Sequence, residues 1–268
     1  MNYTAQIEEA KKKFEAVLTD QLARVERMKS EKDFIDYGAL DQIIIGVVGG
    51  DGIGPAITEQ AERILKFLLK DEMESGKVAF KEITGCTIEH RAEVNKALPD
   101  DVLEELKQCH VILKGPTTTP RQGDPWPNIE SANVAMRKEL DLFANVRPVK
   151  VPEEGIDWTF YRENTEGGYA VGSKGVDVTD DLAIDFVVQT YEGTKRIAKA
   201  AFDYAKKTGK TRVTCVTKAN VIKTTDGNFL NVCKEVAKDY PGIELDDWYI
   251  DIMTAKLVDP KGKRGAAG

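Results

Sequence analysis

The segment Val47–Pro55, with the sequence VVGGDGIGP, joins an apolar run that begins at Ile43 to a stretch with helical periodicity. A strand, a glycine-rich turn and a helix outline the fingerprint in which a helix N-terminus binds a pyrophosphate. The spacing argues against that fingerprint, because it needs glycines at i, i+2 and i+5, and counting from Gly50 the third position is Pro55. The acidic residue expected about 20 positions later would be Asp71, which follows a helix instead of a second strand. The residues alone leave open both a ligand role and a purely structural turn.

From Ile43 onward, strand-like and helix-like segments alternate, which predicts an α/β fold. A polar loop over Lys114–Ile129 holds four of the ten prolines, and loops of this length are usually functional or disordered. Ser131 is placed to cap the helix that follows this loop. Further along, the pattern predicts a long helix over Asp185–Lys207, ended by Gly209.

Residues 1–40 form a charged segment with helical periodicity. Its apolar residues make one stripe, formed by Ile7, Phe14, Leu18, Leu22, Val25 and Met28. We therefore predict a helical N-terminal extension that packs against the body of the protein or against a partner subunit.

The composition is that of a globular protein. The net charge of −7 argues against a nucleic-acid partner, because binding to phosphates favours a basic surface. No apolar run has the length of a membrane span, and the first 20 residues fit neither a signal peptide nor a transit peptide. The four widely spaced cysteines suggest a reducing compartment, so we expect a cytoplasmic protein. With only two histidines, catalysis would have to depend on Lys, Tyr, Asp or Arg.

Several basic residues lie where they could bind a small polyanion. Asn133 and Arg137 are four residues apart and share one face of the predicted helix. Arg147 and Arg162 each follow an extended run and are expected at strand ends. Arginine binds carboxylates through two parallel hydrogen bonds. The alternative for each arginine is an exposed surface ion pair.

Lys218 and Asp251 could carry chemistry, whereas the chemistry of Tyr169 alone does not favour it as a catalytic residue. Lys218 follows the strand-like run RVTCVT at its carboxyl end, where open α/β sheets place ligands, and a lysine there could act as a general base. Tyr169 lies in a glycine-rich stretch that suggests a hairpin arm. Asp251 ends another predicted strand and could be one ligand of a divalent cation. The alternative for Lys218 is an ordinary surface lysine in a strand-to-helix loop.

The chain resembles the decarboxylating isocitrate and isopropylmalate dehydrogenases, and the isocitrate branch most closely. The matching motifs occur in the family's order between Ile43 and about Pro260: GDGIGP (50–55), LKGPTTTP (113–120), SANVAMRKELDLFANVRP (131–148), YRENTEGGY (161–169), VTKAN (216–220) and YID (249–251). The resemblance implies the family's non-Rossmann α/β fold, in which the GDGIGP turn is mainly architectural.

The resemblance also implies roles for single positions. Those that match substrate-carboxylate ligands are Ser131, Asn133, Arg137, Arg147 and Arg162. The pattern Ser131-x-Asn133 favours isocitrate, since the isopropylmalate branch has apolar residues in this region. Tyr169 and Lys218 match the catalytic pair, and Asp251 matches a metal-binding aspartate. Those that match positions near the nicotinamide are Thr118 and, less closely, Lys114 and Thr119.

By this resemblance we expect oxidative decarboxylation of isocitrate to 2-oxoglutarate, a tricarboxylic acid cycle reaction, with Mg²⁺ or Mn²⁺ and with NAD or NADP. The alternatives are a dehydrogenase of a related 2-hydroxy diacid, such as isopropylmalate or homoisocitrate, and a non-catalytic subunit or fragment. A homodimer is also implied, because family members complete each site with residues of a neighbouring subunit.

The expected organisation has four parts. Residues 1–40 are the helical extension, and 41–142 are the N-terminal part of a large domain. Residues 143–260 are a small α/β domain with a clasp arm at about 167–188, and 261–268 are a tail unlike the family. The family continues with a Gly-Asp-x-x-Ser/Thr-Asp segment and an adenosine-binding loop, which are not found here. The large domain is therefore expected to be incomplete, by truncation, by frameshift or because another chain supplies the rest. The residues that distinguish NAD from NADP would lie in that part.

Overall fold

The computed structural model describes residues 3–30, 35–121, 123–172 and 174–258. The chain divides into two compact units, Lys32–Asp141 and the combination of Met1–Glu31 with Leu142–Gly268. The division after Asp141 lies one residue from the sequence-predicted boundary between 142 and 143. The predicted tail at 261–268 lies outside the described residues.

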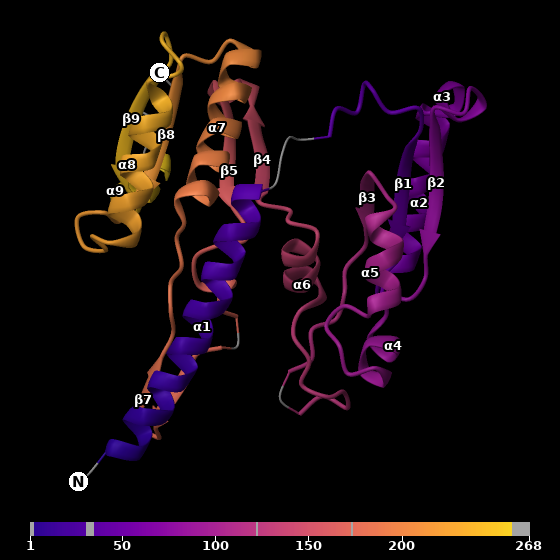
Figure 1. The fold of residues 1–268 in the computed structure, drawn as a ribbon. Helices are drawn as coiled ribbons and strands as arrows, with labels where there is room; N and C mark the ends of the chain where they lie inside the picture. The colour runs from indigo at the N-terminus through magenta and orange to yellow at the C-terminus, as the bar shows by residue number, and fades with distance from the viewer. Residues whose placement is uncertain (1–2, 31–34, 122, 173, 259–268) are drawn as a thin grey trace. The chain divides into compact units, whose positions relative to one another are not determined.

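The unit Lys32–Asp141 is built on a parallel sheet with the strand order β2-β1-β3 (Figure 1). The strands are β1 (Ile43–Val48), β2 (Val78–Ile83) and β3 (Val111–Lys114), and the register pairs Ile45 of β1 with Phe80 and with Val111. The helices are α2 (Gly54–Leu68), α3 (Lys70–Glu74), α4 (Ile88–Glu93), α5 (Asp100–Lys107) and α6 (Ala132–Glu139). Val48 and Ile83 of the sheet form a core with Val102, Leu106, Ala132 and Met136 of α5 and α6. This packing fixes the start of α6, which carries three of the predicted site residues.

The second unit begins with the long helix α1 (Thr4–Ser30), and its described residues contain three pairs of strands. Antiparallel β4 (Ala144–Val151) and β5 (Ile156–Glu163) are joined by the short 3-10 helix η1 (Pro152–Glu154). After η2 (Gly168–Ala170), the hairpin of β6 (Val176–Thr179) and β7 (Leu182–Ile184) lies within the predicted arm at 167–188. The parallel pair β8 (Arg212–Thr217) and β9 (Glu244–Tyr249) alternates with α7 (Tyr191–Thr208), α8 (Thr225–Ala237) and α9 (Ile250–Val258). Phe202 of α7 is fully buried against Cys215 of β8 and Val232 of α8.

Two predicted elements differ from the structure. The helix predicted from Asp185 begins at Tyr191, because Thr190 is extended and its side chain caps the helix by accepting the N–H of Gly193. The residues before it stay extended, and Val188 bridges to Gly167. Gly209 ends α7 as predicted, with a φ of 71°. Asp251 does not end a strand but lies in the first turn of α9, which starts directly after β9.

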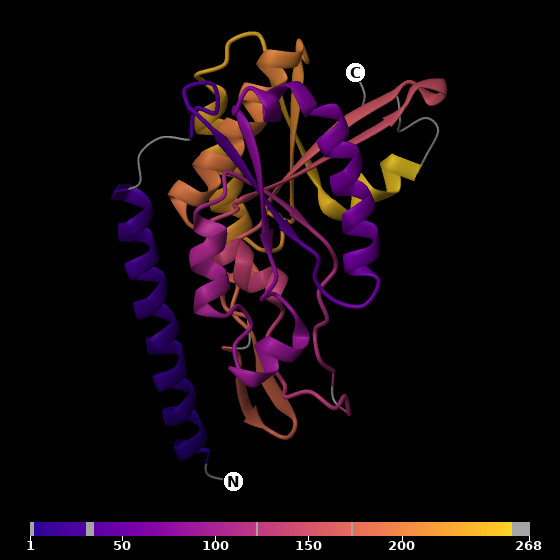
Figure 2. The ribbon, with the colours of Figure 1, turned by 90° about the vertical axis from the view of Figure 1, so that its right-hand side faces the viewer.

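The packed face of helix α1 includes only part of the predicted stripe. Val17 is buried, whereas Leu18 and Leu22 of the stripe remain 46% and 66% exposed. Phe14 of the stripe does pack, with its ring 5.2 Å from that of Phe186, and Val25 and Met28 are half-buried. Figure 2 shows α1 as one continuous, nearly straight helix. The packed face also includes charged residues outside the stripe, since Arg24 forms an ion pair with Glu166.

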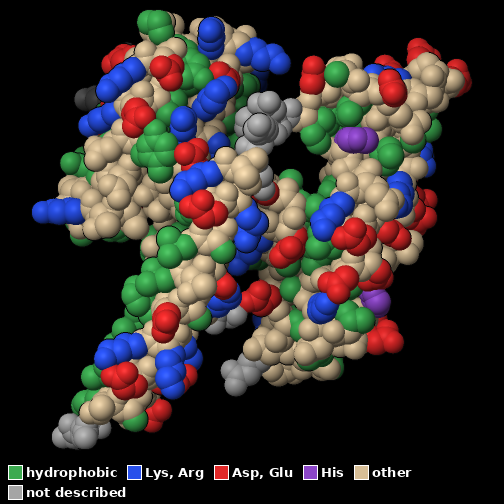
Figure 3. All heavy atoms as spheres, viewed as in Figure 1, with side chains coloured by type: hydrophobic (Ala, Val, Ile, Leu, Met, Phe, Trp, Pro, Cys, Tyr) green, Lys and Arg blue, Asp and Glu red, His purple; other side chains and the backbone are tan. Residues whose placement is uncertain are grey.

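Basic, acidic and hydrophobic side chains are intermixed on the face shown in Figure 3. None of the helices in the described ranges has the length and apolarity needed to cross a bilayer.

Candidate functional site

The glycine-rich turn at 50–55 is held against the loop that follows β3. Gly50 has a φ of +73°, and a Cβ added there would lie 2.0 Å from the carbonyl oxygen of Pro116. The N–H of Asp51 donates to that same oxygen at 2.8 Å. The Asp51 carboxylate accepts the N–H groups of Ile88 (2.7 Å) and Thr118 (2.6 Å). A carboxylate therefore occupies the backbone donors near this turn, and the turn positions the Thr118 loop.

Arg91 holds the same loop from the other side, and sequence reasoning did not single it out. Its side chain is fully buried and donates to the carbonyl oxygens of Ala97 (2.9 Å), Thr118 (2.7 Å) and Glu130 (3.1 Å). Burial lowers the pKa of this guanidinium. Because Arg91 binds both Thr118 and Glu130, it fixes the two ends of the proline-rich loop. An arginine in a short amphipathic helix carries no sequence signal for such a role.

The start of α6 presents the first group of predicted substrate ligands. Ser131, Asn133 and Arg137 are all half-buried. Ser131 occupies the N-cap position, but contrary to the prediction its side chain makes no capping hydrogen bond. Burial lowers the pKa of the Lys114 amine, and the positive charges of Arg91 and Arg137 lower it further. Positive charge in the unit Lys32–Asp141 is thus concentrated near Ser131, at the start of α6. Thr118 belongs to the same unit.

The other predicted substrate ligands lie on the β4–β5 pair. Asn145 is directly opposite Arg162, so these side chains and that of Arg147, two residues along, share one face. Arg147 donates through Nε to Oδ1 of Asn145 at 2.8 Å. Arg162 is near the end of β5 as predicted, but Arg147 lies inside β4, because this strand extends to Val151. The opposite face packs on α7, where the ring of Tyr161 lies 5.5 Å from that of Tyr204, so the arginines are on the open face.

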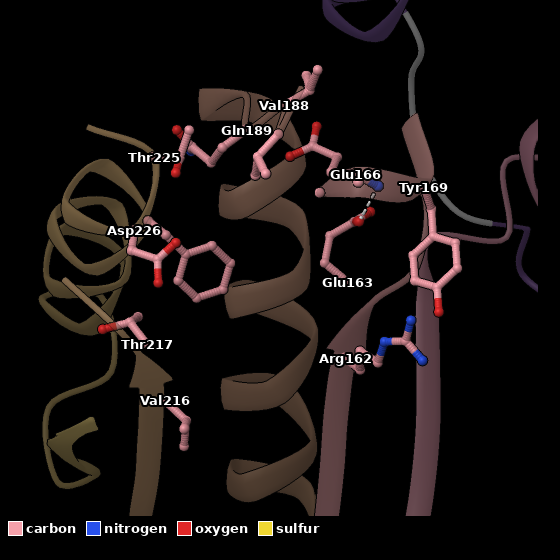
Figure 4. Close-up of a pocket in the computed structure, with 14 residues that line it drawn as sticks. Arg162, Glu163, Glu166, Tyr169, Val188, Gln189, Val216, Thr217, Thr225 and Asp226 are labelled. Carbon is pink, nitrogen blue, oxygen red and sulfur yellow. Dashed lines mark hydrogen bonds between the residues drawn. The ribbon is translucent and has the colours of Figure 1, made fainter. Parts of the chain in front are cut away.

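Tyr169 belongs to the Arg162 group. The guanidinium carbon of Arg162 lies 5.0 Å from the centre of the Tyr169 ring, a cation–π contact. Figure 4 shows the guanidinium near the hydroxyl end of the Tyr169 side chain. Tyr169 is 48% exposed, so its hydroxyl can reach a ligand.

These residues border an open cavity of about 310 Å³. One wall is the segment Arg162–Tyr169, and the other is the end of β8 with the start of α8, represented by Thr217 and Asp226 (Figure 4). Val187–Gln189 line it between the two walls. The cavity is at the carboxyl end of β8, where α/β sheets place ligands, as the sequence analysis expected for Lys218.

Lys218 and Asp251 form an ion pair next to this cavity. The Nζ of Lys218 lies 2.6 Å from Oδ1 of Asp251, and the backbone N–H of Lys218 donates to Asp226 at 2.6 Å. The hydrogen bond and charge of Lys218 lower the pKa of Asp251. The structure therefore brings together two residues that are 33 positions apart in the sequence because parallel β8 and β9 end side by side.

Two carboxylates near Tyr169 were not singled out from the sequence. Glu163 accepts the N–H and the hydroxyl of Thr165 at 2.8 and 2.6 Å, and burial raises its pKa. Glu166 is 6% exposed and forms an ion pair with Arg24 of α1. Both lie within the motif YRENTEGGY, whose buried acids could have been flagged, but the partner in α1 has no sequence signal.

Asp251 is suited to be one ligand of a divalent cation, because its carboxylate is 66% exposed and ionised. In the ranges that the structure describes, no three His, Cys, Asp or Glu side chains are grouped as a metal site. Asp251 is therefore one candidate ligand, and the described residues do not make a complete metal site.

Of the nine predicted site residues, Thr118, Ser131, Asn133 and Arg137 belong to the unit Lys32–Asp141. The other five belong to the second unit, where the structure pairs Arg162 with Tyr169 and Lys218 with Asp251; the fifth is Arg147.

Comparisons with known proteins agree with the fold. A family model described as isocitrate/isopropylmalate dehydrogenase matches residues 44–264. The chain is 35% identical over 228 residues to a homoisocitrate dehydrogenase of Methanocaldococcus jannaschii, covering 79% of this chain and 62% of that protein. It is 39% identical over 228 residues to a 3-isopropylmalate dehydrogenase of Archaeoglobus fulgidus, covering 81% and 63%.

The solved structure of an isocitrate dehydrogenase from Methylococcus capsulatus is similar, with a TM-score of 0.67 at 33% identity, over 82% of this chain and 64% of that one. The chain thus spans less than two thirds of the length of these relatives. Its mixed α/β fold is that of the isocitrate/isopropylmalate-type dehydrogenases, and the chain belongs to the isocitrate/isopropylmalate dehydrogenase family.

Proposed function

We propose that this chain carries substrate-binding and catalytic residues for the metal-dependent oxidative decarboxylation of isocitrate to 2-oxoglutarate with NAD or NADP. The observation that carries the proposal is the cavity between Arg162–Tyr169 and the end of β8, with the Lys218–Asp251 pair beside it. Membership of the family supports the reaction class. The four cysteines are free thiols, which supports a reducing location such as the cytoplasm.

Arginine provides the binding energy for a polycarboxylate. Arg147 and Arg162 present guanidinium groups on one face of β4–β5, and Arg137 presents another on α6. Ser131 supports isocitrate over isopropylmalate, because its hydroxyl is not used in capping and can donate to a carboxylate. The second candidate substrate is a related 2-hydroxy diacid, because similar proteins are named homoisocitrate dehydrogenase and 3-isopropylmalate dehydrogenase.

Lys218 and Tyr169 divide the proton transfers. Lys218 accepts the proton of the substrate hydroxyl, and Tyr169 later donates its proton to the enol carbon after CO₂ has left. When bound, the nicotinamide would supply the hydride acceptor and the divalent cation would polarise the substrate oxygens, with Thr118 and Asp251 among the residues that would hold these two groups. Asp251 forms an ion pair with Lys218, and its exposed carboxylate would be one of the groups that hold the cation.

Replacing Arg162 by alanine is expected to weaken isocitrate binding about tenfold or more. A charge-assisted hydrogen bond contributes about 1.5–3 kcal/mol, and every 1.4 kcal/mol is tenfold in affinity. Calorimetry with isocitrate and Mn²⁺ measures this loss of affinity. The affinities for homoisocitrate and isopropylmalate, measured in the same way, show which of the three substrates binds most tightly.

Lys150→Ala is the matched control, since this exposed β4 residue pairs with Asp157 at the other end of the hairpin. Its exposed ion pair contributes little, so the affinity should not change. Equal isocitrate affinities for wild type and Arg162→Ala would contradict the substrate assignment.

We further propose that the chain forms a homodimer through the arm at 167–188. Leu182, Ile184 and Val187 of the arm are 43–57% exposed, and a two-stranded ribbon has unpaired edges that favour association. Light scattering at micromolar concentration should give twice the chain mass, and Ile184→Asp should shift it towards the monomer. The exposed turn variant Asp180→Asn should remain dimeric. A monomeric wild type would contradict this proposal.

A further inference from the structure

Helix α1 precedes the part of the chain that matches the family, which begins at residue 44, so the family comparison assigns it no role. The structure packs it along the arm. Phe14 contacts Phe186, Val17 is 5% exposed, and Asp20 forms an ion pair with Lys174. These positions recur every three residues and define the inner face of the helix.

Arg24 lies on the same face of the helix, and its side chain contacts the segment Thr165–Glu166. Its Nη1 lies 3.0 Å from Oε1 of Glu166, and its Nη2 donates to the hydroxyl of Thr165 at 3.1 Å. The two charged side chains are only 16% and 5% exposed. This pair is therefore shielded from water, unlike the other ion pairs of α1, which are exposed. Removing one partner of a buried pair leaves the other charge uncompensated.

Glu166 is held at a defined place by α7 as well. It accepts the N–H of Thr190 at 3.0 Å and the Thr190 hydroxyl, so its carboxylate lies at the N-terminus of the helix, where negative charge is favoured. A Cβ on Gly193 would lie 2.1 Å from Oε1 of Glu166, so only glycine leaves room for the carboxylate. Glu166 thus joins three elements, α1, α7 and the end of β5.

The same segment leads directly to Tyr169. The N–H of Gly167 donates to the carbonyl of Val188 at 2.8 Å, and Glu166, Gly167, Gly168 and Tyr169 all line the cavity. Thr165 and Glu166, the two residues that Arg24 binds, lie four and three residues before Tyr169, respectively. A shift of Glu166 would therefore move the backbone that places the Tyr169 ring over Arg162.

We propose that Arg24 of α1 is a positioning residue, which acts through Glu166 and Thr165 to hold the segment that presents Tyr169. The extension thereby becomes part of the catalytic unit. The inference rests on the proposed function for its effect on substrate, but its structural step can be tested separately.

The test compares Arg24→Met, Arg24→Lys and the control Arg27→Met, an exposed residue one turn further along α1. Hydrogen exchange followed by mass spectrometry reports the amides of residues 163–170, with β8 as a reference. Arg24→Met is expected to exchange about tenfold faster or more in this segment, while β8 and Arg27→Met stay at wild-type rates. Arg24→Lys keeps the charge but cannot bind both partners, so it should be intermediate, and it remains informative if Arg24→Met does not fold.

Calorimetry with isocitrate and Mn²⁺ gives the second readout, in which Arg24→Met should bind about tenfold more weakly and Arg24→Lys should recover part of the affinity. Unchanged exchange in residues 163–170, or acceleration of equal size in β8, would overturn the proposal. A wild type that binds no hydroxy diacid counts against the proposed function instead, and hydrogen exchange then decides the positioning role alone.

Discussion

Replacing Lys218 by methionine is expected to slow substrate oxidation by about 10²–10⁴-fold, the range that positioned general acids and bases contribute. Methionine has similar length but cannot accept the hydroxyl proton. Tyr169→Phe should instead leave the rate of the hydride step unchanged and slow the decarboxylation and protonation steps. The measurement is NADH or NADPH formation from isocitrate with Mg²⁺ or Mn²⁺, in a preparation in which the wild-type chain turns over.

The ion pair provides a readout that needs no turnover. Lys218 holds the pKa of Asp251 below its ordinary value of 3.8, so in Lys218→Met this carboxyl should titrate at higher pH, as carboxyl NMR can measure. Because the pKa of Asp251 is lower in the folded state, this carboxylate stabilises the fold at pH values above its unfolded-state pKa. That contribution disappears as the pH falls through the folded-state pKa. Asp251 is well exposed, so the change in stability should be small.

Lys223→Met is the matched control, because Lys223 is an exposed lysine five residues further along the same loop. It should retain the wild-type rate and the wild-type titration of Asp251. Full activity of Lys218→Met would remove Lys218 from the catalytic assignment, and an unchanged Asp251 titration would contradict the ion pair.

Replacing Gly50 by alanine is expected to destabilise the unit Lys32–Asp141 by about 3–5 kcal/mol. The φ of +73° strains any residue with a Cβ, and this Cβ would lie 2.0 Å from the carbonyl oxygen of Pro116, so the backbone must move. The movement would break the hydrogen bond from Asp51 to Pro116 and release the Thr118 loop. Native-state hydrogen exchange of β1 and β3 gives the free energy of opening for this unit.

Gly52→Ala separates strain from collision. Gly52 has a similar φ of +60°, but an added Cβ meets nothing within 4 Å. Only the left-handed backbone is then unfavourable, so the loss should be about 1–2 kcal/mol. Equal losses for the two variants would show that backbone strain, and not the contact with Pro116, makes Gly50 necessary.

Local patterns were sufficient for most elements. The apolar run at 43–48, the cap glycine at 209 and the extended runs around 143–162 gave β1, the end of α7, β4 and β5, because each signal depends on neighbouring residues. The predictions were wrong where a residue far away in the sequence determines the local structure. Arg147 lies inside β4 because pairing with β5 extends the strand. The inner face of α1 is set by Phe186, Lys174 and Glu166, which are all more than 140 residues away.

The sequence by itself determined the family and the identity of the candidate residues, because ordered motifs such as LKGPTTTP and YRENTEGGY carry that information locally. Only the tertiary structure decided their environment. It placed Asp51 against the Thr118 loop, buried Arg91 among three carbonyl groups, and paired Lys218 with Asp251. It also connected Arg24 to Glu166 beside Tyr169. Charge pairing and burial depend on which chain segments meet in space, and no pattern of neighbouring residues specifies those meetings.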